Sequence, residues 1–250
     1  MNLSNIALAA FLLLSLTIGH ADGFEAREYK NSEGNSLPYQ LLKPKDYNPK
    51  NKYPMLIFLH GSGERGTDNE RQLIHSRKLL ISAATEHQSF AIAPQCPKGI
   101  RWVEVHWAAA SHIMPVTASE PMRLLLELLA SLEQEFSLDT HRRYVIGLSM
   151  GGFGVWDCLC RYPEMFAAGV PVCGGGDETK AHLIKNIPVW VFHGSMDTVV
   201  QPIRSRNMVA AIKTAGGSPL YTEYQGVAHN SWVPAFQEPG LLNWLFEQKR

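Results

Sequence analysis

Three side chains whose chemistry could combine in one reaction lie at or just after the ends of short apolar runs: Ser149, Asp197 and His229. A serine hydroxyl is a weak nucleophile at neutral pH, so a general base must take its proton during attack. A carboxylate that holds this base in one tautomer completes the set. We therefore predict a catalytic triad in which Ser149 attacks, His229 is the base and Asp197 orients it.

The residues around Ser149 predict a sharp turn. Ser149 closes the apolar run RYVIGLS within the pattern G-x-S-x-G, whose glycines are Gly147 and Gly151. Glycine at these two positions leaves room for a strand-to-helix turn that a Cβ would obstruct. Such a turn would expose the Ser149 hydroxyl. We expect Gly152 and Gly154 to let the following helix pack closely on the sheet.

Other residues compete for the roles of acid and base. Asp177, which follows AAGVPVCGGG, could orient the histidine in place of Asp197. His60 and His193 each precede a glycine at the end of an apolar run, where hydrogen bonding to a loop is a sufficient role. The remaining histidines have no supporting spacing and are interpreted as surface or packing residues: His75, His87, His106, His112, His141 and His182. No metal is predicted, because no histidine, cysteine and carboxylate set has the spacing of a zinc site.

Attack on a carbonyl also requires hydrogen-bond donors for the charge that develops on its oxygen. The backbone N–H of Met150, directly after the nucleophile, is one expected donor. We expect the second to be the N–H of Ser62, in the loop HGSGERG that follows the run YPMLIFLH. Gly61 and Gly63 would let this backbone approach the substrate. Glu64 and Arg65 would brace the loop by pairing with each other or with a neighbour.

The elements that must position these residues alternate along the chain. Short runs rich in β-forming residues predict strands, several of them apolar on consecutive residues as in a buried parallel sheet: 53–60, 89–95, 143–149, 167–173, 188–194 and 219–225. Helical patterns lie between them, the clearest over 121–136 and another from Met150. EAREYK and SLPYQLLKP flank the turn-rich NSEGN and predict an antiparallel hairpin at a sheet edge. This alternation predicts an α/β fold with three α/β/α layers and a mostly parallel sheet. Ligands of such sheets bind at the carboxyl ends of the strands.

Composition bounds the domain count and the partners. The chain has 250 residues, 45% of them hydrophobic, and no linker or internal repeat divides it. We therefore expect a single catalytic domain over 22–250. The 23 basic and 23 acidic residues give no net charge, so nucleic acid is not a predicted partner.

The first 21 residues resemble a secretory leader. An apolar stretch over 6–18 is shorter than a membrane span needs, and Gly19 and Ala21 are small residues placed for cleavage after Ala21. We expect a signal peptide over 1–21, a secreted or periplasmic product and no stable membrane insertion after cleavage; an uncleaved anchor is the alternative. Lysine and arginine are absent from this leader, which departs from the usual pattern.

Export would permit disulfides, yet the cysteines do not form an evident framework. Cys158 and Cys160 are two apart on an expected helix, while Cys96 and Cys173 lie near the ends of different expected strands. We favour buried free thiols over any bridge, because free cysteine packs as a small hydrophobe.

A family resemblance rests on the motifs FLHGSGERGTDN, AIAPQCP with a following RW, GLSMGG, PVCGGGD, FHGSMDTVVP and AHNSW. Together they resemble the α/β-hydrolases, in the esterase branch described as dienelactone-hydrolase-like, feruloyl-esterase-like or prolyl-oligopeptidase-family. The resemblance covers nearly the whole chain from about Tyr53. It implies that an exported enzyme hydrolyses carboxylic esters without a cofactor, with Ser149, Asp197 and His229 at the matching positions.

The expected substrate is a small-molecule or polysaccharide-linked ester, with feruloyl and acetyl esters of plant polysaccharide as examples that the resemblance suggests. A small exported serine peptidase or a lysophospholipase with the same triad is the alternative, followed by a non-catalytic binding protein on a hydrolase scaffold. Trp102 and Trp232 are the aromatic candidates for a substrate pocket, although each could instead cover the edge of the core. Residues 97–119 could form a small lid or specificity loop.

Overall fold

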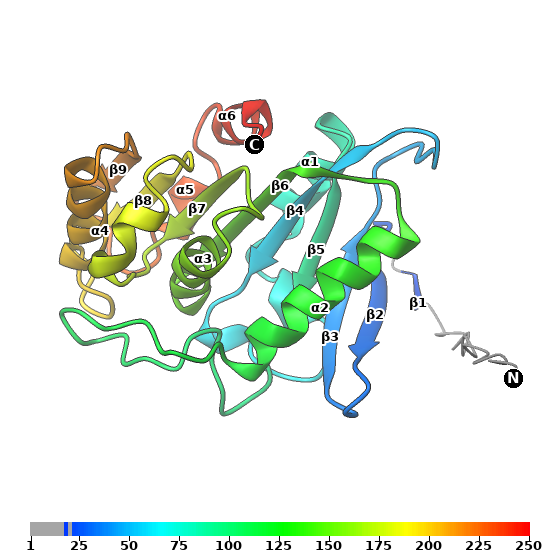
Figure 1. Ribbon diagram of the computed structural model, residues 1–250, viewed down its shortest axis with the longest axis horizontal. Helices are drawn as coiled ribbons and strands as arrows, with labels where there is room; N and C mark the ends of the chain where they lie inside the picture. The colour runs from blue at the N-terminus through cyan, green and yellow to red at the C-terminus, as the bar shows by residue number, and fades with distance from the viewer. Residues whose placement is uncertain (1–17, 20–21) are drawn as a thin grey trace, which may run out of the picture.

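A computed structural model describes residues 18–19 and 22–250, and Figure 1 shows its architecture. One mixed sheet runs through the described part of the chain in the strand order β1-β2-β3-β5-β4-β6-β7-β8-β9. The strands are β1 Ile18–Gly19, β2 Glu25–Lys30, β3 Ser36–Leu42, β4 Tyr53–Leu59, β5 Phe90–Pro94, β6 Leu138–Leu148, β7 Ala168–Val172, β8 Trp190–Gly194 and β9 Leu220–Tyr224. From β5 to β9 in this order neighbours pair in parallel, whereas β1, β2 and β3 join antiparallel. The expected α/β fold with a mostly parallel sheet is confirmed.

The helices form a layer on each face of this sheet (Figure 1). They are α1 Arg77–Glu86, α2 Glu120–Glu135, α3 Met150–Arg161, α4 Ile203–Thr214, α5 Trp232–Ala235 and α6 Leu241–Glu247, with 3-10 turns η1 Ser62–Glu64, η2 Arg71–Leu73 and η3 Glu178–Leu183. On one face, α2, α3 and α4 contribute Leu128, Trp156 and Met208 to the core. On the other face, α1 and α6 contribute Leu80 and Leu245. The three layers follow, because a central strand must bury both of its faces.

The central strands are apolar throughout for this reason. Every residue of β4, β5 and β7 is buried. β6 begins at Leu138, earlier than the apolar run from Arg143 predicts, and continues through the polar residues 139–142. The side chains of 139–142 are only partly buried or exposed. A stretch of this kind can be polar, so the pattern of apolar runs did not predict it.

The N-terminal hairpin is confirmed, with β2 and β3 paired from Glu25 opposite Leu41 to Lys30 opposite Ser36. Most of the predicted leader, residues 1–17 and 20–21, lies outside the described residues. Ile18 and Gly19 form β1, which pairs with β2 and so lies outside the hairpin at this edge of the sheet. Among the described residues, no helix has both the length and the apolar character of a membrane span.

Candidate active site

The turn at Ser149 joins β6 to α3. Ser149 adopts φ 51° and ψ −116°, a left-handed φ that a residue with a Cβ rarely adopts. The flanking glycines are required by space: a Cβ at Gly151 would lie 1.9 Å from the Leu59 carbonyl oxygen, and one at Gly147 would lie 2.5 Å from the Gly151 oxygen. A strained backbone of this kind persists because the surrounding structure fixes it. The turn therefore holds Ser149 at the carboxyl end of β6.

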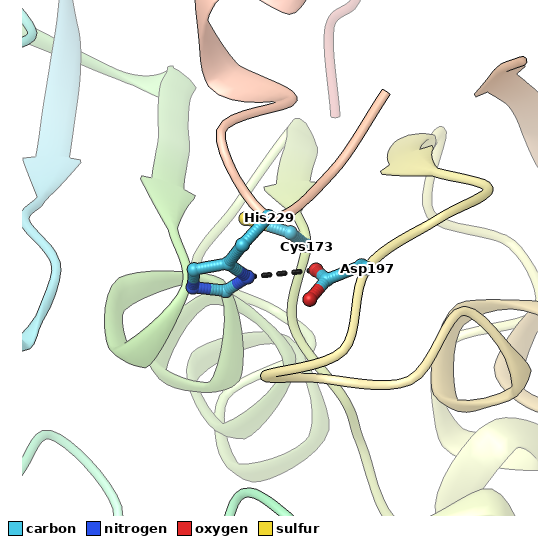
Figure 2. Close-up of side chains that lie close together, drawn as sticks. All are labelled: Cys173, Asp197 and His229. Carbon is cyan, nitrogen blue, oxygen red and sulfur yellow. Dashed lines mark hydrogen bonds and ion pairs between the residues drawn. The ribbon is translucent and has the colours of Figure 1, made fainter. Parts of the chain in front are cut away.

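The three predicted triad residues come together beyond the carboxyl ends of β6, β8 and β9, which lie within four consecutive strands of the sheet. The Ser149 Oγ lies 2.9 Å from His229 Nε2, and His229 Nδ1 lies 2.7 Å from Asp197 Oδ2. Figure 2 shows the His229 ring facing the Asp197 carboxylate, with Cys173 beside them. Because Asp197 is an acceptor, Nδ1 carries the proton and Nε2 is free to accept from Ser149. This is the tautomer that a general base for serine needs.

Asp197 is buried and well supplied with donors. Its Oδ1 accepts from the backbone N–H groups of Val199 and Val200, at 2.9 and 3.0 Å. Burial opposes ionisation, but hydrogen bonds from His193 and His229 outweigh it and hold the pKa of Asp197 well below its ordinary value. The carboxylate is therefore charged at neutral pH.

His193 is a second histidine on this carboxylate. The ring is fully buried, and its Nε2 lies 2.8 Å from the Val200 carbonyl oxygen and 3.2 Å from Asp197 Oδ2. Both neighbours are acceptors, so Nε2 carries a proton. The other nitrogen, Nδ1, lies 2.7 Å from Ser205 Oγ. The sequence predicted that His193 would form a hydrogen bond to a loop, and the Val200 carbonyl oxygen is that partner. The contact with Asp197 was not predicted.

Asp177, the alternative acid, lies elsewhere. Its Oδ2 accepts from the backbone N–H of Met114 at 2.8 Å, and its Oδ1 accepts from Thr179 N–H and hydroxyl at 3.0 and 2.7 Å. It caps η3 and fastens the irregular 97–119 connection. No hydrogen bond joins it to His229 within the described chain.

The two expected oxyanion donors lie at the starts of helical turns. Ser62 opens η1 and Met150 opens α3, where the first N–H groups of a helix have no partner within it. Gly61 is constrained, because a Cβ there would lie 2.6 Å from Leu148 Cδ1. Gly63 is not, because nothing lies within 4 Å of a Cβ built there. Close packing in this loop thus requires glycine at one of its two predicted positions.

The loop that follows β4, where an oxyanion donor is expected, is braced by His60 and Trp102. The ring nitrogens of His60 lie 2.6 Å from the Gly61 oxygen and 2.9 Å from the Cys96 N–H, and burial lowers the pKa of His60 to about 4. Trp102 Nε1 donates to the His60 carbonyl oxygen at 3.1 Å. Trp102 is fully buried, so the expectation that it lines a substrate pocket is wrong. The neighbouring motif gave no way to tell a ring beneath the loop from one above it.

Glu64 and Arg65 do not pair with each other. Arg65 Nε donates to the Ser62 carbonyl oxygen at 2.9 Å and Nη1 to the Ile100 carbonyl oxygen at 3.3 Å. Glu64 instead turns toward His75, with 3.6 Å between Oε1 and Nε2. The expectation that Glu64 would pair with a neighbour is met by His75.

Trp232 lies beside the triad. It is half-buried, and its ring meets His229 edge-on, with 5.5 Å between ring centroids and an interplanar angle of 87°. The centroid of the same ring lies 5.3 Å from that of His75. Trp232 also lines a groove of about 360 Å³ between α1 and α5. The sequence pointed to this tryptophan but gave no signal for the groove residues before α1.

The cysteines of the described chain are free and buried. Cys173, Asp197 and His229 each offer a ligand atom, and these atoms lie within 4.8 Å of one another. Burial raises the pKa of the Cys173 thiol to about 12. The hydrogen bond between Asp197 and His229 already accounts for this cluster.

Comparisons with known proteins place this geometry in context. A protein-family model described as "Putative esterase" matches residues 31–172. The structure of a thermostable esterase is 39% identical, with a TM-score of 0.83, over 92% of this chain and 64% of that chain. A ferulic acid esterase structure is 19% identical, with a TM-score of 0.62, over 89% of this chain and 97% of that chain, and so shares the fold.

A curated relative points the same way over part of its length. The bifunctional acetylxylan esterase/xylanase of Neocallimastix patriciarum is 20% identical over 173 residues, which are 69% of this chain. The match spans 23% of that relative.

Proposed function

This chain belongs to the esterase family whose model it matches, and on that premise we propose that it is a serine carboxylesterase that works through an acyl-enzyme. The observation that carries the proposal is the continuous series of hydrogen bonds from Ser149 through His229 to Asp197, at 2.9 and 2.7 Å. It provides a nucleophile, a base in the required tautomer and a buried charge behind it.

In the acylation half of the reaction, His229 Nε2 takes the proton of Ser149 as Oγ bonds to the acyl carbon. The carbonyl oxygen becomes an oxyanion, which the backbone N–H groups of Ser62 and Met150 stabilise. Collapse of this intermediate breaks the bond to the alcohol oxygen, and that oxygen receives the proton from His229. Asp197 stays ionised and stabilises the imidazolium in between.

In the deacylation half, water takes the place of the alcohol. His229 removes its proton, the hydroxyl bonds to the acyl carbon, and the same two N–H groups hold the second oxyanion. Release of the carboxylic acid returns the proton to Ser149. Every group that this scheme uses belongs to the chain itself, so we propose that the reaction needs no cofactor.

For the substrate we propose feruloyl or acetyl esters linked to plant polysaccharide, supported by the similarity to a ferulic acid esterase structure and to an acetylxylan esterase. We further propose that residues 1–21 are a signal peptide, that 22–250 act as one catalytic domain and that the product is secreted or periplasmic. The mass of the protein recovered from the producing cells tests cleavage after Ala21.

The function is tested with purified protein and p-nitrophenyl acetate. We expect turnover, covalent labelling by a fluorophosphonate probe, and the loss of nearly all of both in Ser149→Ala. Ser32→Ala, in the exposed turn between β2 and β3, is the matched control and should behave as the unaltered protein. Turnover by Ser149→Ala at the unaltered rate would contradict the proposal.

The substrate class is tested on the same preparation. Methyl ferulate, acetylated xylan, a lysophospholipid and an aminoacyl amide separate the proposed esterase from a lipase-like or peptidase activity. We expect kcat/KM to be highest for the first two. A higher value for the lysophospholipid or the amide would assign the triad to the alternative activities.

A further inference from the structure

The groove between α1 and α5 is separated from His229 by a single ring, that of Trp232. Trp232 lines the groove, and the centroid of its ring lies 5.5 Å from that of His229. In the proposed reaction the alcohol oxygen must receive a proton from His229, so the alcohol part of an ester lies on the His229 side of the scissile bond. The groove is therefore placed to receive that part of the substrate.

The walls of the groove combine apolar surface with polar atoms. Ile74 and Val233 line the groove and are 64% and 49% exposed. Phe236 and the ring of Trp232 add aromatic surface. Such walls fit a ring that has an apolar face, because flat apolar surface packs against an aromatic ring.

His75 supplies a polar atom to this groove, and a buried carboxylate lies behind it. Glu64 is 9% exposed, and its Oε1 lies 3.6 Å from His75 Nε2. Its Oε2 is buried without a hydrogen-bond partner among the described residues. A buried carboxylate with so few partners is costly to keep, so its retention beside the oxyanion loop calls for an explanation.

Fixing His75 is the explanation that the geometry supports. At 3.6 Å the Glu64 carboxylate is too far from His75 Nε2 for a direct hydrogen bond, but its charge favours a proton on that nitrogen. In the neutral ring this leaves Nδ1 as an acceptor. His75 is one-third exposed and lines the groove, so this ring can meet a ligand there. The ring of Trp232 lies next to that of His75. Its Nε1 is buried and has no hydrogen-bond partner in the described chain.

We propose that this groove is the subsite for the alcohol part of the ester, and that it selects a hydroxylated ring, as in a sugar. The apolar face of the ring packs on Trp232, and a ring hydroxyl donates to His75, which Glu64 holds in place. His75 and Trp232 are then specificity residues, and Glu64 is a positioning residue. The assignment rests on the proposed esterase function.

The test compares two esters that share one acyl group. Methyl acetate and an acetylated methyl xyloside differ in the alcohol, so the ratio of their kcat/KM values measures alcohol selectivity. We expect the unaltered protein to favour the xyloside. Trp232→Ala should lower that ratio about tenfold, and His75→Phe, which keeps a ring, about fivefold.

The positioning role of Glu64 has its own readout. Glu64→Gln keeps the shape of the side chain and removes its charge, so it should lower the ratio in the same direction as His75→Phe. Because Glu64 acts through His75, the double variant should be no worse than His75→Phe alone. Effects that add in the double variant would overturn this role.

The control is His141→Phe, an exposed histidine near the start of β6, the opposite end of the strand from Ser149. It should keep the ratio of the unaltered protein. Circular dichroism checks that each variant is folded, and inhibition of p-nitrophenyl acetate turnover by methyl xyloside measures the subsite in the unaltered protein without any substitution.

Two results would overturn the subsite. One is an unchanged ratio in Trp232→Ala and His75→Phe together with no inhibition by methyl xyloside. The other is a change confined to methyl ferulate relative to methyl acetate, which would assign the groove to the acyl part. Failure of the proposed function differs from both, since the unaltered protein would then hydrolyse neither acetate ester and Ser149 would not be labelled.

Discussion

At the scale of single residues, Asp197, the proposed acid of the triad, is held by more contacts than the one to His229. Asp197 Oδ2 accepts a hydrogen bond from His229 Nδ1 at 2.7 Å and lies 3.2 Å from His193 Nε2. Its Oδ1 accepts from two backbone N–H groups. These contacts fix the carboxylate in one rotamer and keep it ionised in a buried position. The direction in which His229 presents Nε2 to Ser149 depends on that rotamer.

Removing this support should weaken catalysis while Ser149 remains present. We expect His193→Leu to lower kcat for p-nitrophenyl acetate by ~10-fold or more, because an oriented hydrogen bond to a buried charge is lost. His193→Gln retains an N–H donor and should recover part of the rate.

A simple loss of packing would give a different pattern. In that case His193→Gln and His193→Leu would lose rate equally. Fluorophosphonate labelling of each variant separates fewer active molecules from slower ones.

At the scale of elements, the contact between β4 and the start of α3 leaves no space for a side chain. A Cβ at Gly151 would lie 1.9 Å from the Leu59 carbonyl oxygen, a backbone atom that cannot move aside. We expect Gly151→Ala to lower the free energy of unfolding by ~3 kcal/mol or to prevent folding. Denaturant unfolding followed by circular dichroism measures this.

Gly63→Ala is the matched control, because a Cβ there meets nothing within 4 Å. Its free energy of unfolding should stay within ~0.5 kcal/mol of the unaltered value. Equal destabilisation by both substitutions would show that the strand-to-helix turn tolerates more movement than these distances allow.

At the scale of the whole molecule, stability should fall in mildly acidic solution. Burial lowers the pKa of His60 to about 4, from 6.5 in an exposed chain. Between these values the unfolded chain binds a proton that the folded protein does not, so the free energy of unfolding falls as the pH falls. His112, with its pKa lowered to about 4 mainly by burial, acts in the same direction. Asp197 adds to the loss only below about pH 4.

His60→Gln should therefore flatten the fall in stability between pH 6.5 and 4. The part that His60 contributes is at most ~3 kcal/mol. Unfolding measured in denaturant at several pH values gives the slope, which is compared between variants so that any constant loss of stability cancels. His182→Gln, at an exposed histidine of η3, should keep the original slope.

Much of the site could be predicted because its residues follow strands. Ser149, Asp197 and His229 each lie at or after an apolar run, and parallel strands bring their carboxyl ends to one edge. The groove could not be predicted in this way. His75 and Trp232 come from segments far apart in the chain, and only the packing of α1 beside α5 joins them. Trp102 was misplaced because an aromatic residue near a motif packs equally well below a loop or above it.

Cleavage of the proposed leader would change which strand forms the edge of the sheet, and so how two molecules could associate. β1 lies at the end of the sheet, and cleavage after Ala21 would remove it and leave β2 as the free edge. Exposed edges invite pairing with another chain unless charge interrupts them. β2 reads EAREYK, and its Glu25, Arg27, Glu28 and Lys30 form ion pairs along that edge. The mature protein would therefore expose an edge that already resists aggregation.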